Sequence, residues 1–192
     1  KGSRIKNLLG NYPKPMIKFN DKHFIQYCLN CFSKYNFKRI IILCGYRNKI
    51  FFKKFDNRFQ NLIKVICIKE NKLLGTGGAL YNLKKINVKN FVLINGDTVF
   101  NIDLKLLVSH LDKKSIGIVA LTKNLNQKSK KLNNLGIKDK YLTLKENSKL
   151  MNGGIYFFKK TIFKYVEKKV ISLENEILPK LINKKLIQGK FF

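Results

Sequence analysis

The chain has 192 residues, of which 45% are hydrophobic, so it is long and apolar enough to bury the core of one α/β domain. This composition excludes a wholly disordered chain. No apolar run approaches the about 18 residues that a membrane-spanning helix needs, and no secretory signal is visible. The length predicts a single domain over residues 1–192. Because the chain has only four cysteines, we expect it in a reducing cytoplasm.

The net charge of +29 suggests a nucleic-acid-binding protein, because Lys and Arg number 40 against 11 Asp and Glu. However, 36 of these cations are Lys and 4 are Arg, while Asn and Ile each occur 22 times and Ala twice. This pattern is typical of AT-rich codon usage, and Arg is the usual residue for reading bases and phosphates. Codon bias therefore explains the charge better, and nucleic-acid binding stays the less favoured alternative.

Strands and helices alternate along the predicted chain. In the first half of the chain, the pattern predicts a helix over 24–35, a strand over 39–44, a weaker helix over 48–55, a strand over 62–68, a Gly-rich turn over 75–78, a helix over 79–85 and a strand over 91–94. In the second half, it predicts a helix capped by Asp103 that reaches about 111, a strand over 115–121, a polar loop over 122–134, and strands over 141–145 and 155–158. A helix over 172–182 capped by Ser172 and a strand over 186–192 follow. This order indicates an α/β sandwich with a mostly parallel sheet, in which ligands bind beyond the carboxyl ends of strands.

Two segments near the start of the chain suit phosphate binding. Lys1-Gly2-Ser3-Arg4 offers backbone access, a hydroxyl and a guanidinium, although an ordinary turn explains it as well. Lys14 lies between Pro13 and Pro15, so we expect a stiff extended segment that holds its ammonium against a phosphate. The alternative is that Lys14 is one more lysine among many.

Three further segments lie at the expected ligand edge, two of them after predicted strands and the third beside a later strand. Gly75-Thr76-Gly77-Gly78 precedes a helix whose N-terminal N–H groups would be free for a nucleotide, unless the segment is a simple tight turn. Asp97, after Gly96, suits Mg²⁺ shared with phosphates, unless it is a turn or cap residue. Asn152-Gly153-Gly154 suits sugar hydroxyls, and a hairpin turn explains it equally well.

The cysteines and histidines do not form a recognisable catalytic or zinc motif. Cys28 and Cys31 form a CxxC pair without a second close pair, so we expect them on the buried stripe of a helix. His23 and His110 lie away from the other motifs and are expected to be structural.

Taken in order, the motifs resemble the sugar-1-phosphate nucleotidyltransferases, also called NDP-sugar pyrophosphorylases. The order is GSR, PKPM, LGTGGA after Glu70, NGDT, KEN, NGGIY and SLENEILP, and it covers nearly the whole chain. The resemblance is greatest to heptose 1-phosphate and mannose-1-phosphate guanylyltransferases. It implies a Rossmann-like GT-A-type fold, a three-layer α/β/α sandwich with a mixed, mostly parallel sheet.

The resemblance also implies roles for individual residues. It assigns catalysis to Arg4, Lys14 and Asp97; nucleotide binding to Gly2, Ser3, Gly75, Thr76, Gly77 and Gly78; sugar-phosphate binding to Gly96, Glu146, Asn152 and Gly154; and Mg²⁺ binding to Asp97. Asn147 departs from the family, which usually has Lys there, and Leu144 replaces its usual Phe. By the same resemblance, the chain is expected to lack the family's first strand and its C-terminal end, which carries a second metal-binding Asp.

The implied reaction joins a sugar 1-phosphate to a nucleoside triphosphate and releases pyrophosphate, for cell-surface polysaccharide such as lipopolysaccharide or capsule. GTP with a heptose or mannose 1-phosphate is expected, with no membrane or nucleic-acid partner. Uridylyl, cytidylyl and thymidylyl transfer onto hexose phosphates stay open as alternatives. A homologue that binds sugar nucleotides without turnover remains an alternative, and so does an incomplete chain that is inactive.

Overall fold

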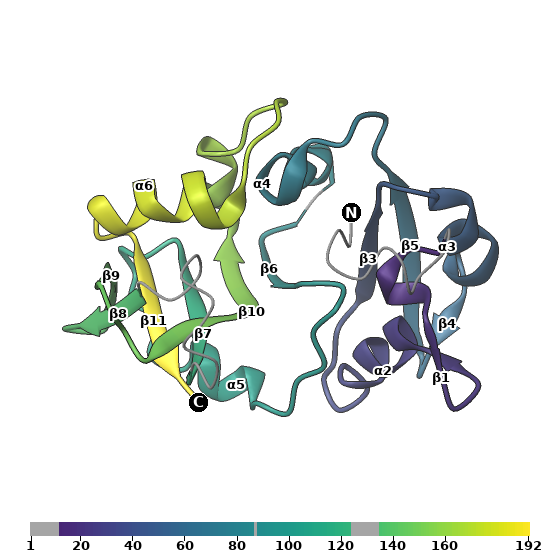
Figure 1. Cartoon of the computed structure of the whole chain (residues 1–192), viewed down its shortest axis with the longest axis horizontal. Helices are drawn as coiled ribbons and strands as arrows, with labels where there is room; N and C mark the ends of the chain where they lie inside the picture. The colour runs from purple at the N-terminus through teal and green to yellow at the C-terminus, as the bar shows by residue number, and fades with distance from the viewer. Residues whose placement is uncertain (1–11, 87, 124–134) are drawn as a thin grey trace. The chain divides into compact units, whose positions relative to one another are not determined.

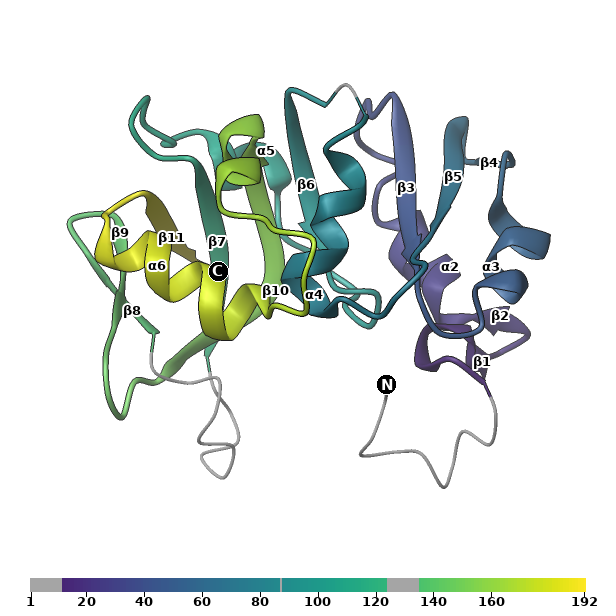
Figure 2. The ribbon, with the colours of Figure 1, turned by 90° about the horizontal axis from the view of Figure 1, so that it is seen from above.

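A computed structural model describes residues 12–86, 88–123 and 135–192 of the chain (Figures 1 and 2). Contacts between residues divide the chain into two compact units, one of Lys1–Leu73 with Gly96–Asn101 and one of Leu74–Asn95 with Ile102–Phe192. Each unit has its own sheet. The expected single domain over residues 1–192 stays a prediction, because two such units can belong to one folding domain.

The first unit is built around the parallel strands β3 and β5. Its described elements are η2 (a 3₁₀ turn, Lys14–Met16), β1 (Lys18–Phe19), β2 (Lys22–His23), α2 (Phe24–Asn30), β3 (Arg39–Cys44), α3 (Asn48–Phe55), β4 (Phe59–Gln60) and β5 (Ile63–Lys69). The sheet order is β3-β5-β4, with β4 antiparallel to β5, and β1 pairs with β2 as a separate small ribbon.

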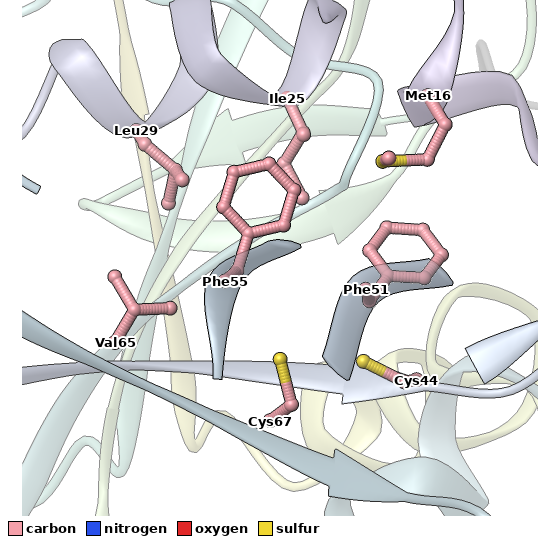
Figure 3. Close-up of a cluster of buried hydrophobic side chains, with 8 residues drawn as sticks. All are labelled: Met16, Ile25, Leu29, Cys44, Phe51, Phe55, Val65 and Cys67. Carbon is pink, nitrogen blue, oxygen red and sulfur yellow. The ribbon is translucent and has the colours of Figure 1, made fainter. Parts of the chain in front are cut away.

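The core of the first unit lies between α2, α3 and the β3–β5 pair (Figure 3). Its buried side chains are those of Met16, Ile25, Leu29, Cys44, Phe51, Phe55, Val65 and Cys67. The helical spacing of apolar residues in α2 and α3 and the apolar runs of both strands aim these side chains at one another. This apolar contact is what holds the small unit together.

Helix α2 is shorter than the predicted helix over 24–35. It begins where the backbone N–H of His23 donates to Gln26 Oε1 at 2.9 Å. After Asn30 the chain continues in turns, and the hydroxyl of Ser33 donates to the Asn30 carbonyl at 2.8 Å. A serine hydroxyl that competes for a carbonyl of the helix in this way favours an early end.

The second unit contains a six-stranded mixed sheet. Its described elements are α4 (Gly75–Ala79), η3 (Leu80–Leu83), β6 (Asn90–Ile94), α5 (Leu104–Val108), β7 (Gly117–Lys123), β8 (Leu135–Lys138), β9 (Tyr141–Leu144), β10 (Leu150–Lys159), η4 (Lys160–Lys164), η5 (a π-helical turn, Leu173–Ile177), α6 (Leu178–Asn183) and β11 (Ile187–Phe191). The strand order is β6-β10-β7-β11-β9-β8. Helices α5 and α6 lie on opposite sides of this sheet, so the unit has the expected α/β/α layers (Figures 1 and 2).

The α/β class and the mixed sheet are confirmed, but the expectation of a mostly parallel sheet is wrong for the described strands. Among the described strands, only the neighbouring pairs β3–β5 and β7–β11 run parallel. Strand β10, for example, is antiparallel to all three of its neighbours, β6, β7 and β8. The error has a simple cause. An apolar run identifies a buried strand but carries no information on the direction of its neighbour.

Several predicted elements are confirmed with shifted ends. Asp103 caps α5, since its side chain accepts from the backbone N–H of Lys105, and Ser172 caps η5 in the same way. The predicted helix over 172–182 is divided into η5 and α6, because Pro179 has no N–H to continue the regular ladder. The short strands β1, β2, β4 and β8 were not predicted. Of the predicted loop over 122–134, Thr122 and Lys123 end β7, and the rest lies outside the described residues.

No helix in the part of the chain that the structure describes is long and apolar enough to cross a membrane.

Candidate active site

In the first unit, the structure brings together two predicted site segments that are 83 residues apart in the sequence. The ammonium of Lys14 donates to Asp97 Oδ2 at 2.5 Å. Both side chains remain substantially exposed, at 39% and 42%. An exposed ion pair contributes little to stability, so this pairing is poorly explained as a device for holding the fold together.

The local backbone explains how Lys14 reaches Asp97. Instead of the expected extended segment, residues Lys14–Met16 form a 3₁₀ turn, which begins after Pro13 and accommodates Pro15 in its first turn. The ring of Pro15 lies 3.4 Å from the position that a Cβ on Gly96 would take. The proline turn and the loop that follows β6 therefore lie next to each other, as do Lys14 and Asp97, which these two segments carry.

Cys28 lies near this pair but does not offer a reactive thiolate. It is buried in α2, and burial, together with the nearby Cys31 thiol and Asp97 carboxylate, raises its pKa to about 12. A thiol that stays protonated is a poor metal ligand and nucleophile. The prediction that Cys28 and Cys31 lie on the buried stripe of a helix is confirmed for Cys28, whereas Cys31 follows the last residue of α2 and is only partly buried.

In the second unit, the Gly-rich segment is helical instead of a turn. Residues Gly75–Ala79 form α4, and the N–H groups of Gly77 and Gly78 both donate to the Ile171 carbonyl, at 3.0 and 3.2 Å. The expectation that these N–H groups are free for a nucleotide is therefore wrong, because a carbonyl 93 or more residues away already satisfies them. Gly75 and Thr76 are exposed, whereas Gly77 and Gly78 are buried.

Thr76 is tied to the segment that precedes α6. Its hydroxyl donates to Glu174 Oε2 at 2.5 Å and accepts from the Leu173 N–H at 2.9 Å. Glu174 also accepts a hydrogen bond from the hydroxyl of Tyr156 on β10, at 3.4 Å. The Gly-rich segment and β10 are thus joined through one carboxylate.

Asn152 and Gly154 lie inside β10, not in a turn before it. Between Asn152 and Tyr156 the pairing of β10 with β7 shifts register, and Gly154 adopts a φ of +73° there. Such a bulge re-aims the side chains next to it. The amide of Asn152 accepts from the Gly154 N–H at 2.9 Å and donates to the Tyr156 hydroxyl at 2.8 Å, which leaves one amide N–H for a ligand.

The remaining predicted site residues are Glu146 and the segment Gly2-Ser3-Arg4. Glu146 is exposed in the turn between β9 and β10, and no hydrogen bond or ion pair joins it to another predicted site residue within the described ranges. Gly2, Ser3 and Arg4 lie outside the described residues.

Comparison with known proteins identifies the family. The family model described as nucleotidyl transferase matches residues 1–191. The D-glycero-alpha-D-manno-heptose 1-phosphate guanylyltransferase of Campylobacter jejuni is 30% identical over 168 residues, which cover 84% of this chain and 73% of that protein. The enzyme of the same name from Aneurinibacillus thermoaerophilus is 28% identical over 197 residues, which cover 100% of this chain and 84% of that protein.

Solved structures agree with the sequence matches. HddC from Yersinia pseudotuberculosis has a TM-score of 0.79 at 27% identity, and the match covers 95% of this chain and 82% of HddC. Its complex with GMP-PN matches with a TM-score of 0.78.

The chain belongs to the nucleotidyl transferase family. It is a sugar-1-phosphate nucleotidyltransferase with the α/β fold of that family, as the order of the motifs predicted.

The groups around Asp97 suit a metal ion that is held partly by substrate better than one held by protein side chains alone. No cluster of three or more His, Cys, Asp or Glu exists among the described residues. Asp97 is an exposed carboxylate with a single cation on one oxygen. This fits Mg²⁺, which commonly takes one or two carboxylates and completes its shell with substrate phosphates and water.

Two functional candidates of the transferase were missed by residue-level reasoning. Glu174 was predicted only as part of the helix over 172–182, and Tyr156 only as part of the strand over 155–158. The SLENEILP and NGGIY motifs that contain them were the available signal. Their shared hydrogen bond joins positions 18 residues apart, which a local pattern cannot predict.

Proposed function

We propose that this transferase is a guanylyltransferase that joins GTP to a heptose or mannose 1-phosphate and releases pyrophosphate. The names of the two relatives above, and the GMP-PN complex of HddC, support this choice of base and sugar. By the same analogy, the product serves cell-surface polysaccharide synthesis. The enzyme would act in the cytoplasm, where nucleoside triphosphates are available, and needs no nucleic-acid partner.

The observation that carries the proposal is the Lys14–Asp97 pair, at 2.5 Å. An oxygen of the sugar 1-phosphate attacks the α-phosphorus of GTP, and the bond from that phosphorus to the departing pyrophosphate breaks. Because the attacking phosphate is already anionic, no strong general base is required. Catalysis then depends on position and on neutralising negative charge.

Lys14 would neutralise charge on the reacting phosphates. When anionic substrates bind, its ammonium can exchange Asp97 for a phosphate oxygen, since both groups are exposed. Asp97 would hold Mg²⁺, which supplies further positive charge at the phosphates when it is bound. Arg4, with Gly2 and Ser3, would bind the triphosphate.

The nucleotide and the sugar would be bound by the other predicted residues. Gly75 and Thr76 are exposed and would contact the nucleotide. Gly77 and Gly78 are buried and would support this contact as part of α4. Gly96 would leave room for the sugar phosphate, while Glu146, Asn152 and Gly154 would bind the sugar.

The test is a panel of the four common nucleoside triphosphates against several sugar 1-phosphates, with pyrophosphate release as the readout. We expect release only when GTP, a manno-configured sugar 1-phosphate and Mg²⁺ are all present. Asp97→Asn should lower kcat/KM by at least about 100-fold, whereas Asp21→Asn, an exposed carboxylate in the turn between β1 and β2, should not change it. Binding without release would instead indicate a non-catalytic homologue, and full activity in Asp97→Asn would refute the metal assignment.

A further inference from the structure

The carboxylate of Glu174 joins the start of α4 to the bulged part of β10. Its Oε2 accepts hydrogen bonds from the hydroxyls of Thr76, at 2.5 Å, and Ser172, at 3.2 Å. Its Oε1 accepts one from the hydroxyl of Tyr156, at 3.4 Å. The two oxygens therefore serve two different segments of the second unit.

The donors in this network point in one consistent direction. The Gly154 N–H donates to Asn152, the Asn152 amide donates to the Tyr156 hydroxyl, and Tyr156 donates to Glu174. Burial raises the pKa of Tyr156, and the charge of Glu174 raises it further, so the phenol keeps its proton. An ionised carboxylate is the group that can accept from both sides, because it carries two acceptor oxygens and no proton.

Side chains other than Glu174 accept directly from the N–H groups at the start of η5. Ser172 Oγ accepts from the Asn175 N–H at 3.1 Å, and Glu176 Oε1 accepts from the Ser172 N–H at 2.8 Å. The Leu173 N–H donates to Thr76 Oγ1 at 2.9 Å, and Glu174 meets this cap only by accepting from the Ser172 hydroxyl. The contacts of Glu174 to Thr76 and Tyr156 thus have a purpose other than capping.

We propose that Glu174 is a positioning residue that orients Thr76 directly and Asn152 through Tyr156. This inference rests on the proposed function, in which Thr76 contacts the nucleotide and Asn152 contacts the sugar. The hydroxyl of Thr76, held between Glu174 and the Leu173 N–H, fixes the exposed start of α4. The amide of Asn152, held between Gly154 and Tyr156, keeps its second N–H in one direction for a ligand.

The decisive variant is Glu174→Gln, because glutamine has the same shape but only one acceptor oxygen. Its oxygen can accept from the Thr76 side or from the Tyr156 side, and its NH2 group then faces the other side and can only donate, so one of the two hydroxyls loses its acceptor. With GTP and mannose 1-phosphate as substrates, we expect KM to rise about tenfold for both, with kcat changed less than about threefold. Thr76→Val should raise KM for GTP alone, and Tyr156→Phe should raise KM for mannose 1-phosphate alone.

The matched control is Glu176→Gln, which removes a carboxylate two positions away but keeps an acceptor for the Ser172 N–H. It should leave both KM values unchanged. A purely structural role of Glu174 predicts a different result, namely a lower Tm with a lower kcat and unchanged KM. That result, or unchanged kinetics in Glu174→Gln, overturns the inference.

The same variants separate this inference from the proposed function. If the wild-type protein releases no pyrophosphate with any substrate pair, the proposed function fails, and calorimetric binding of GTP becomes the readout. A Glu174→Gln affinity about tenfold below wild type still supports positioning, whereas equal affinity overturns it. A wild-type protein that binds neither GTP nor mannose 1-phosphate overturns both.

Discussion

Lys14 and Asp97, two of the predicted site residues, form an exposed ion pair. Their 2.5 Å contact is solvent-accessible, and such contacts contribute about 0–1 kcal/mol to folding. The same accessibility leaves both charges open to phosphate and metal. The exposure of both charges therefore supports the proposal that Lys14 and Asp97 belong to the substrate site.

The proposed role of Lys14 at the reacting phosphates predicts the effect of Lys14→Met. The variant should lower kcat/KM for pyrophosphate release about 100-fold, because a charge that stabilises the reacting phosphates is lost. Its Tm should stay within about 2 °C of wild type. Lys22→Met, an exposed lysine of β2, is the control and should leave both quantities unchanged. A Lys14→Met enzyme with wild-type kcat/KM would show that Lys14 has no catalytic role.

At the scale of elements, α4 is a helix because another segment completes it. Four of the five residues of α4 are poor helix formers or glycine, but the Ile171 carbonyl accepts from two of its N–H groups. A Cβ on Gly78 would lie 2.3 Å from the Lys169 carbonyl oxygen and 2.6 Å from Leu74 Cβ. The glycines of α4 thus permit close packing against the protein's own backbone.

Gly78→Ala should therefore destabilise the protein. Relieving a backbone overlap by moving α4 costs about 1–3 kcal/mol, which corresponds to a fall in Tm of about 3–10 °C. Gly96→Ala is the control for thermal denaturation, because its Cβ would meet only Pro15, at an ordinary 3.4 Å. A Tm of Gly78→Ala equal to wild type would contradict the close packing of α4.

At the scale of the whole molecule, the net charge of +29 makes the stability of the fold sensitive to low pH. Each carboxylate that is protonated at low pH adds to a large positive charge that repels itself. Asp112 is the carboxylate with the clearest structural role. It accepts from the Ser115 N–H at 2.7 Å, from the Tyr141 hydroxyl at 2.9 Å and from the Lys140 ammonium at 3.1 Å.

These hydrogen bonds give a prediction for pH. Burial alone would raise the pKa of Asp112, but the bonds from Ser115, Tyr141 and Lys140 outweigh it and hold the pKa below its ordinary value. A lowered pKa stabilises the fold above the unfolded-state value of about 4, and the benefit disappears as pH falls from there toward the folded value. Asp112→Asn should lower Tm at pH 7 by about 3–6 °C, and this difference should shrink below about pH 4. A difference that is constant from pH 7 to pH 3 would refute the role of the charge.

Most of the elements could be predicted from the sequence, because each depends on residues close together in the chain. The apolar run Arg39–Cys44 and the amphipathic segment Asn48–Phe55 were predicted with their observed ends. Asp103 and Ser172 were predicted as caps for the same reason, since a cap bonds to N–H groups two or three residues away. The order of the motifs was also enough to indicate the family.

Only the tertiary structure decided the directions of the strands and the partners of the polar groups. Nothing near β10 in the sequence shows that its neighbours run antiparallel, or that Gly77 and Gly78 donate to Ile171. Lys14 meets Asp97 across 83 residues, and Thr76 meets Glu174 across 98. Periodicity and capping are local properties of the chain, whereas a hydrogen-bond partner depends on how distant segments pack, and the site is made of such partners.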